Sequence, residues 1–154
     1  ALFNLELLKA NSGTDTNAGA TNVDTYAMAS GLTAKDRVAV FYGLEAVTQQ
    51  AASLTLHNST DSVKAGELSG AAALTAGNTI GGLAVLQQAQ SGATTIIGLQ
   101  LASNTDAVMT GDKTIVATFT TAWTGAWTLA LRHGGVTAGG TLKWTWNVCV
   151  VRGQ

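Results

Sequence analysis

The chain has 154 residues, a formal net charge of -1, and 11% charged residues against 46% hydrophobic ones. A length of this order favours a single domain, and a domain of about 150 residues buries roughly 68–70% of its unfolded surface, so it needs no disulfide or metal to fold. The eight Lys and Arg residues are scattered apart from Lys35 and Arg37, which argues against a nucleic-acid-binding surface.

Membrane insertion and oxidation are also excluded as organising features. The apolar runs are strand-length and are interrupted by Thr and Gly, whereas a membrane-spanning helix takes about 20 apolar residues. Cys149 is the one cysteine, so no intrachain disulfide can form, and we expect it to be a small packed residue.

The amino-acid composition of residues 1–34 differs from that of the rest of the chain, and two interpretations of this segment are open. An apolar cluster near the start is followed by a polar, low-complexity tract over residues 11–22. The segment is either a first strand plus a long loop, or an extended arm that anchors on a neighbouring subunit. We divide the chain into this arm or loop segment, 1–34, and a β-domain, 35–154. On the arm interpretation, the residues that contact the partner are Leu2, Phe3, Leu5 and Leu7.

The middle of the chain is a succession of short strand-like runs. Each is rich in β-branched and aromatic residues or alternates apolar with polar ones, and turn-forming residues separate them. The pattern predicts strands over residues 38–47, 52–57, 79–88, 94–102 and 113–120.

The C-terminal part has the clearest period of two. Residues 127–132 and 141–150 both alternate, and glycine pairs stand at both ends of the connection between them. We predict a long antiparallel hairpin with Trp127, Trp144 and Trp146 on one sheet face. With seven or eight short strands in all, the expected fold is an all-β antiparallel sandwich of jelly-roll type with an extended N-terminal arm.

An internal echo supports the all-β prediction. Residues 54–67 align without gaps on residues 99–112, and both copies run from a strand through an Asn/Thr-Asp corner to a glycine followed by an acid. Asn and Asp make such corners by hydrogen-bonding their own backbone, so the repeat predicts equivalent Asx-turns in two halves of one sandwich.

Catalytic and metal-binding patterns are missing from the sequence. Asp61 with Glu67, and Asp106 with Asp112, suggest calcium, but neither corner has the spacing of a dedicated loop, and we interpret them as solvated turn acids. Two histidines, His57 and His133, with one thiol do not make a zinc site. Neither a nucleophile elbow nor a phosphate-binding glycine loop is present. We therefore expect no catalytic residue, no metal and no cofactor.

The tryptophans leave one binding hypothesis. Trp144 and Trp146 share the apolar register of their strand and are expected in the core. Trp123 lies between turn residues and is the candidate for a surface contact, such as stacking on a sugar ring.

The features together resemble the jelly-roll decoration, or cement, proteins of tailed-bacteriophage capsids. The resemblance is carried by the N-terminal segment, the Thr/Ala/Gly-rich β-domain and the alternating end over residues 147–154. It implies a homo-oligomer, with a trimer favoured, that is assembled in the host cytoplasm and bridges neighbouring major capsid subunits on the virion surface. No enzymatic activity, nucleic acid or membrane is implied. The low charge fits a surface committed to subunit contacts.

Three classes of function remain in competition. A shell-decorating protein predicts symmetric oligomers. A carbohydrate- or receptor-binding module of a phage fibre or tail predicts an exposed aromatic platform. An enzyme predicts a pocket with converging polar groups around His57, His133 and the corner acids.

Overall fold

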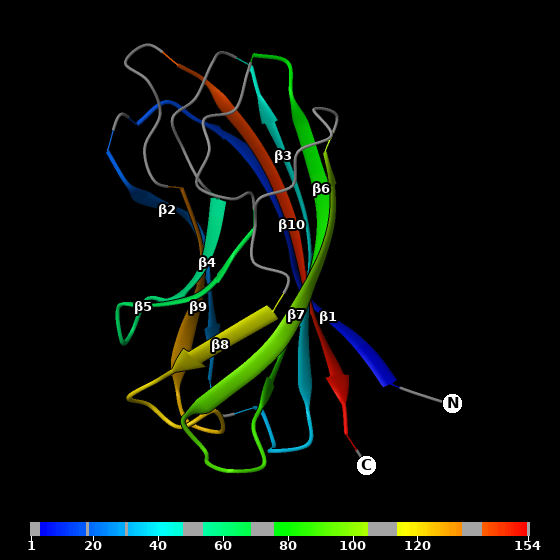
Figure 1. The fold of residues 1–154 in the computed structure, drawn as a ribbon, viewed down its shortest axis with the longest axis vertical. Helices are drawn as coiled ribbons and strands as arrows, with labels where there is room; N and C mark the ends of the chain where they lie inside the picture. The colour runs from blue at the N-terminus through cyan, green and yellow to red at the C-terminus, as the bar shows by residue number, and fades with distance from the viewer. Residues whose placement is uncertain are drawn as a thin grey trace.

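The computed structural model describes residues 4–17, 19–29, 31–47, 54–68, 76–104, 114–133 and 140–153. These residues form ten β-strands and no helix. The strands make two antiparallel sheets that pack face to face as a sandwich (Figure 1). The predicted all-β antiparallel sandwich is confirmed.

The two sheets differ in size. In spatial order, the six-stranded sheet contains β1 (Asn4–Asp15), β10 (Leu142–Arg152), β3 (Arg37–Ala46), β6 (Thr79–Gln88), β7 (Thr95–Asn104) and β8 (Thr114–Thr118). The four-stranded sheet contains β2 (Thr21–Met28), β9 (Trp127–His133), β4 (Leu54–Asn58) and β5 (Val63–Glu67). The strands predicted in the middle of the chain correspond to β3, β4, β6, β7 and β8.

The prediction that residues 127–132 and 141–150 pair as a C-terminal hairpin is wrong. β10 pairs with β1 and β3 in one sheet, whereas β9 pairs with β2 and β4 in the other. A period of two reports that one face of a strand is buried, and either sheet of a sandwich provides such a face, so the period does not say which sheet a strand joins. Trp127, Trp144 and Trp146 do all belong to the hydrophobic core.

The N-terminal residues belong to the sandwich. β1 pairs along its length with β10, from Asn4 opposite Arg152 to Asp15 opposite Leu142, and β2 pairs with β9. Of the two interpretations, the first strand agrees with the structure, while a free arm and a loop through residues 11–15 do not. Both β1 and β2 are edge strands, which are stabilised by backbone pairing and tolerate polar side chains, so their apolar pattern is weak. The boundary expected at residue 34 therefore separates no independent unit among the described residues.

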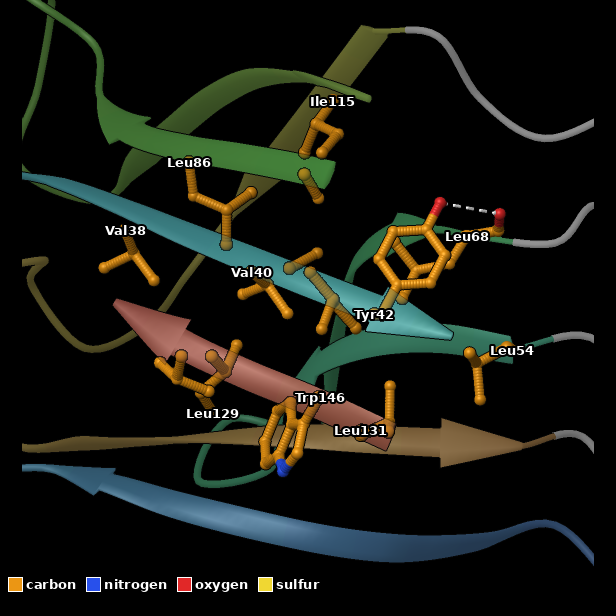
Figure 2. Close-up of a cluster of buried hydrophobic side chains, with 14 of the residues drawn as sticks. Val38, Val40, Tyr42, Leu54, Leu68, Leu86, Ile115, Leu129, Leu131 and Trp146 are labelled. Carbon is orange, nitrogen blue, oxygen red and sulfur yellow. Dashed lines mark hydrogen bonds between the residues drawn. The ribbon is translucent and has the colours of Figure 1, made fainter. Parts of the chain in front are cut away.

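The core lies between the two sheets. Figure 2 shows side chains from β3 and β10 of the larger sheet meeting those of β9 and β4 of the smaller one. Tyr42 is buried among them, and its hydroxyl donates a hydrogen bond to the Leu68 carbonyl (3.1 Å) while accepting one from Gln100 Nε2 (2.9 Å). Burial raises the pKa of Tyr42 to about 12. The core thus includes one polar group whose hydrogen bonds are satisfied within the sandwich.

Candidate functional site

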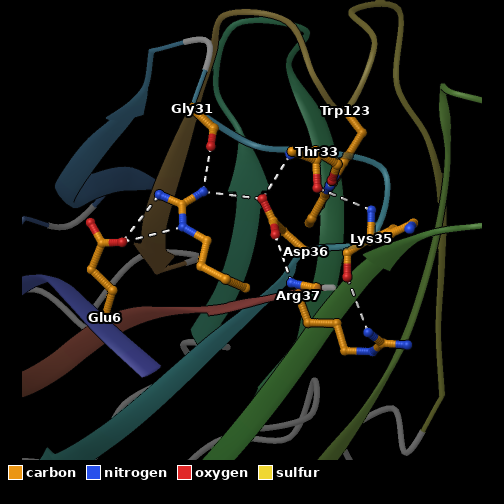
Figure 3. A network of polar contacts seen from close by, with 9 residues as sticks. Glu6, Gly31, Thr33, Lys35, Asp36, Arg37 and Trp123 are labelled. Atoms are coloured by element: carbon orange, nitrogen blue, oxygen red, sulfur yellow. Dashed lines mark hydrogen bonds and ion pairs between the residues drawn. The ribbon is translucent and has the colours of Figure 1, made fainter. Parts of the chain in front are cut away.

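The most elaborate polar cluster of the structure is structural. Asp36 is buried, and its carboxylate accepts hydrogen bonds from the backbone N–H of Thr33 (2.7 Å) and Gly153 (2.9 Å) and from Arg152 Nη1 (3.1 Å) (Figure 3). Arg152 is held in turn by the Gly31 carbonyl and by Glu6 (3.2 Å). Burial alone would raise the pKa of Asp36, but these bonds outweigh it and hold that pKa below its ordinary value. The cluster ties the end of β10 to the turn before β3.

The first corner of the sequence echo is a structural turn. The Asp61 N–H donates to Asn58 Oδ1 (3.1 Å), and Asn58 Nδ2 donates to Asp61 Oδ2 (2.9 Å). An Asn side chain thus bonds the backbone at this corner as predicted, but three residues on rather than the two of an Asx-turn. The Asp61 carboxylate also accepts bonds from the N–H groups of Thr120 (2.9 Å) and Thr121 (2.8 Å). Asp61 is therefore a capping group rather than the solvated acid we expected. The second corner, residues 105–112, lies outside the described residues.

The two histidines do not form one site. His133 is fully buried between the sheets, where its Nε2 contacts the Asp15 carboxylate of β1. His57 instead lies on the outer face of β4, partly exposed. Among the described residues, no group of three or more His, Cys, Asp or Glu side chains is placed to hold a metal ion.

Cys149 is a buried packed residue, as predicted. Its side chain lies between strands β1 and β3 on β10, and burial raises the pKa of its thiol. A thiol with a raised pKa is a poor nucleophile, because the thiolate is the reactive form.

The expected surface role of Trp123 is wrong. Its side chain is 0% exposed and its indole Nε1 donates to the Thr33 carbonyl (3.1 Å). Its ring packs on Trp127, with 5.5 Å between the ring centroids. Trp144 and Trp146 are buried as expected. Trp123 was misplaced because its loop folds over the end of the sandwich, so a position between turn residues did not mean exposure.

The outer face of the six-stranded sheet is the unusual surface of this protein. One row of residues in direct register crosses it from strand to strand and is apolar up to its last member. In order from β1 to β8, the row consists of Leu7, Cys149, Ala39, Val85, Leu99 and Thr114. A second row beside it runs through Phe41, Leu83 and Leu101. Antiparallel sheets with one solvated face usually place polar residues there, so an apolar outer face is unusual.

Strand β7 turns its apolar side outward. Ile97, Leu99 and Leu101 alternate along it and all three are exposed. The intervening Gln100 points into the core and is 4% exposed, where Nε2 donates to the Leu68 carbonyl (2.6 Å). On the neighbouring edge strand, Val116 is 76% exposed. The apolar character is therefore a property of whole strands rather than of one stray side chain.

Charges lie at the margins of this face. Arg37 is opposite Val151 and Gln87 at one end of β3, and Glu45 pairs with Lys143 at the other end (3.8 Å). Between these ends, the outward positions of β3, β6 and β7 that the structure describes carry no charged side chain. A charge-free centre with a polar margin is the usual layout of a protein interface.

The residues expected to contact a partner fall partly on this face. Leu5 and Leu7 are exposed on its β1 edge, so they are outward-facing members of the sheet rather than part of a tether. Leu2 and Phe3 lie outside the described residues. Sequence reasoning missed the larger part of the surface, on β3, β6, β7 and β8, because it took apolar strand residues for core.

Comparison with known protein families finds no match to this chain, and comparison with curated protein sequences finds none either. Within the described ranges, no helix is long and apolar enough to cross a membrane.

Proposed function

We propose that this chain is a structural assembly protein that associates with copies of itself through the outer face of its six-stranded sheet. The observation that carries this proposal is the apolar centre of this face, where Phe41 of β3 and Ile97, Leu99 and Leu101 of β7 are all exposed. Large apolar patches are uncommon on monomeric proteins, because exposed apolar area costs free energy that association recovers.

The size of the face suits a stable interface. Six strands about 4.8 Å apart, each presenting roughly seven residues at about 3.3 Å per residue, make a face of about 650 Å². A standard protein interface buries about 800 Å² on each partner. The low charge of its centre means that a second copy meets no like-charge repulsion there.

The strand order supports a jelly roll, the finer fold that the sequence suggests. The pairs β1 with β10, β2 with β9, β3 with β6 and β4 with β5 are nested, as if one long hairpin had been rolled into a sandwich. A jelly roll is such a pair of interlocked Greek keys with eight strands. In this chain β7 and β8 are then an inserted hairpin that widens the larger sheet beyond β6, and they carry the most exposed apolar residues of the face.

The assembly that we propose is the one implied by the resemblance to phage decoration proteins. In this proposal a homotrimer sits on the surface of a virion and bridges neighbouring major capsid subunits, without catalysis. In this proposal the apolar centre of the face joins the copies to one another, and Leu5 and Leu7, exposed at its β1 edge, contact the capsid subunit. The competing proposal of a sugar-stacking fibre or tail module depended on Trp123, which is buried.

Native mass in solution tests the assembly step. We expect a particle of three times the 15.6 kDa chain mass, and we expect Leu101→Lys or Val116→Lys to reduce it to the monomer, because a charge would be buried in the interface. The matched control is Thr25→Lys, an exposed position on β2 of the other sheet, which should leave the mass unchanged. A wild-type monomer at 100 µM, or equal masses for all variants, would contradict the proposal.

Co-sedimentation with emptied phage capsid shells tests the second step. The wild-type oligomer should sediment with the shells at a fixed ratio, and a double variant Leu5→Ser, Leu7→Ser should sediment less while remaining a trimer. A trimer that never sediments with any shell would leave the assembly proposal standing and remove the capsid proposal.

A further inference from the structure

The outer face of the smaller sheet carries a polar pocket that the assembly proposal does not use. It has a volume of about 170 Å³ and is lined by Asn22, His57, Ser59, Ser62 and Arg132. These residues come from β2, β4, β9 and the turn between β4 and β5. The pocket thus gathers side chains from three adjacent strands and the corner that closes them.

Irregular backbone shapes this pocket on two sides. On β2, the register shifts between Asn22 and Asp24, so Asn22 stands opposite Arg132 on the outer face while Asp24 turns inward to accept a hydrogen bond from Trp146 Nε1 (2.7 Å). A second shift, between Leu56 and His57 against β5, lies beside the pocket. Bulges of this kind re-aim side chains and are frequent next to functional sites.

The corner that completes the pocket has an unusual conformation. Ser62 has a φ of 56°, in the left-handed region that non-glycine residues rarely adopt, and among the described non-glycine residues it alone has a positive φ. Such a conformation is found mainly where the surrounding structure requires a particular direction of the side chain. Here it accompanies a hydroxyl at the pocket wall.

The charge of the pocket is positive. Among the residues that line it, all within the described part of the chain, Arg132 is charged and none is acidic. Asn22 Oδ1 accepts one hydrogen bond from Arg132 Nη1 (3.1 Å), which orients the guanidinium and leaves its other N–H donors available. Lys64, which stands opposite His57 on β5, adds a positive charge that its ion pair with Glu67 (3.1 Å) partly compensates.

The pKa of His57 responds to the burial and charge of this pocket. Burial, followed by the positive charges of Arg132 and Lys64, lowers the pKa of its imidazole. A bound anion would act in the opposite direction on the same group.

We propose that this pocket binds a small oxyanion, a carboxylate or phosphate group, with Arg132 as the principal donor and the hydroxyl of Ser62 as a further donor. A planar guanidinium matches both groups through paired N–H donors. The volume equals that of about six water molecules at about 30 Å³ each, which fits a free phosphate or the acidic end of a single sugar residue. The chemistry is shared by these two sources, and the ligand series below separates them.

The test is a titration of the full chain with inorganic phosphate, acetate and sodium glucuronate, followed by NMR of the His57 ring protons. We expect a saturable shift of these signals and a pKa of His57 that is higher in the bound state than in the free state. The fully buried His133 is the internal reference, whose signals should move less. Glucuronate as the tightest ligand would identify an acidic sugar, and phosphate as the tightest would identify a free or esterified phosphate.

Variants decide whether the pocket is responsible. Arg132→Gln should weaken binding by at least about tenfold, since it removes a charged donor. Ser62→Gly, which relieves the positive φ and removes one hydroxyl, should fold well and weaken binding by about two- to tenfold. Arg37→Gln on the opposite sheet is the matched control and should bind like the wild type. A shift that fails to saturate with all three ligands, or that is the same in Arg132→Gln and Arg37→Gln, overturns the proposal.

Discussion

Leu99 and Gln100, consecutive residues of β7, face opposite ways, and the leucine is 46% exposed while the glutamine is 4% exposed. Inside, Nε2 of the glutamine donates to the Tyr42 hydroxyl and to the Leu68 carbonyl, while its Oε1 is buried without a hydrogen-bond partner among the described residues. The leucine outside is left exposed, and it is one of the residues that the proposed association would cover.

Exposed and buried leucines should therefore respond differently to truncation. At concentrations where the folded chain is monomeric, we expect Leu101→Ala to change the free energy of unfolding by less than about 0.5 kcal/mol. Leu131→Ala, at a fully buried position, should cost about 2–5 kcal/mol. Urea unfolding of both variants checks this, and a cost above 2 kcal/mol for Leu101→Ala would place that residue in the core.

Gly13 should not tolerate a side chain. A Cβ built there would lie 2.7 Å from Cζ2 of the Trp144 ring, which is packed on β1 and cannot swing freely. We expect Gly13→Ala to lower the free energy of unfolding by about 1–3 kcal/mol through overpacking. Gly19→Ala is the matched control because nothing lies within 4 Å of its Cβ position. Equal stability of the two variants in thermal melts would show that the β1–β10 contact is looser than described.

The Asp36 cluster should contribute to stability in a pH-dependent way. Because the pKa of Asp36 is lowered on folding, its contribution is fully present above about pH 4, the range of an unfolded Asp, and is lost as the pH falls through the lower pKa of the folded state. Asp36→Asn should cost about 1.5–3 kcal/mol near pH 7 and progressively less towards pH 2. Asp24 and Asp61, whose pKa values are also lowered, will keep some acid sensitivity in the variant.

Unfolding measured from pH 2 to 7 gives the comparison. Glu45→Gln is the control, since its exposed ion pair with Lys143 should be worth under about 1 kcal/mol. A stability difference between wild type and Asp36→Asn that did not shrink in acid would mean that the carboxylate is not charged in the folded protein.

Removal of residues 1–15 should damage the fold, contrary to the expectation for a detachable arm. The deletion takes away β1 with its ladder to β10, the Lys9–Asp24 ion pair (2.7 Å) and the Asp15 partner of buried His133. We expect the shortened chain to lose cooperative thermal unfolding, whereas the double variant Leu5→Ser, Leu7→Ser should melt within a few degrees of the wild type. A shortened chain with wild-type melting would restore the arm interpretation.

The strands that the sequence predicted are those with a clear apolar pattern. β3 and β6 were placed to within a residue because they lie inside the larger sheet and their side chains are mostly apolar. The edge strand β2 was not predicted, and β1 was only one of two interpretations of its segment, because both are made strands by backbone pairing with distant partners rather than by their own residues. β5 was seen only as the continuation of a corner.

The candidate surface could not have been placed from the sequence alone. The alternation of Ile97, Leu99 and Leu101 is visible in the chain, but a period of two does not say whether its apolar side faces the core or the solvent. In the structure the apolar side of β7 faces outward, and Gly98 between Ile97 and Leu99 has no room for a Cβ beside the backbone of Val85. The oxyanion pocket was equally hidden, because two register shifts bring Asn22, His57 and Arg132 together across three strands.

Because the strand pairs are nested, the first strands to be synthesised pair with the last ones. Among the described strands, β1 pairs with β10 alone, and β10 is the last of the ten to be synthesised, so β1 stays unpaired until then. Local hairpins such as β6–β7 can close early, whereas the outer pairs β1–β10 and β2–β9 close late, and such long-range pairing puts folding in the range of milliseconds to seconds. During that interval β7 already presents its leucines, so newly made chains at high concentration risk meeting one another before each has finished folding.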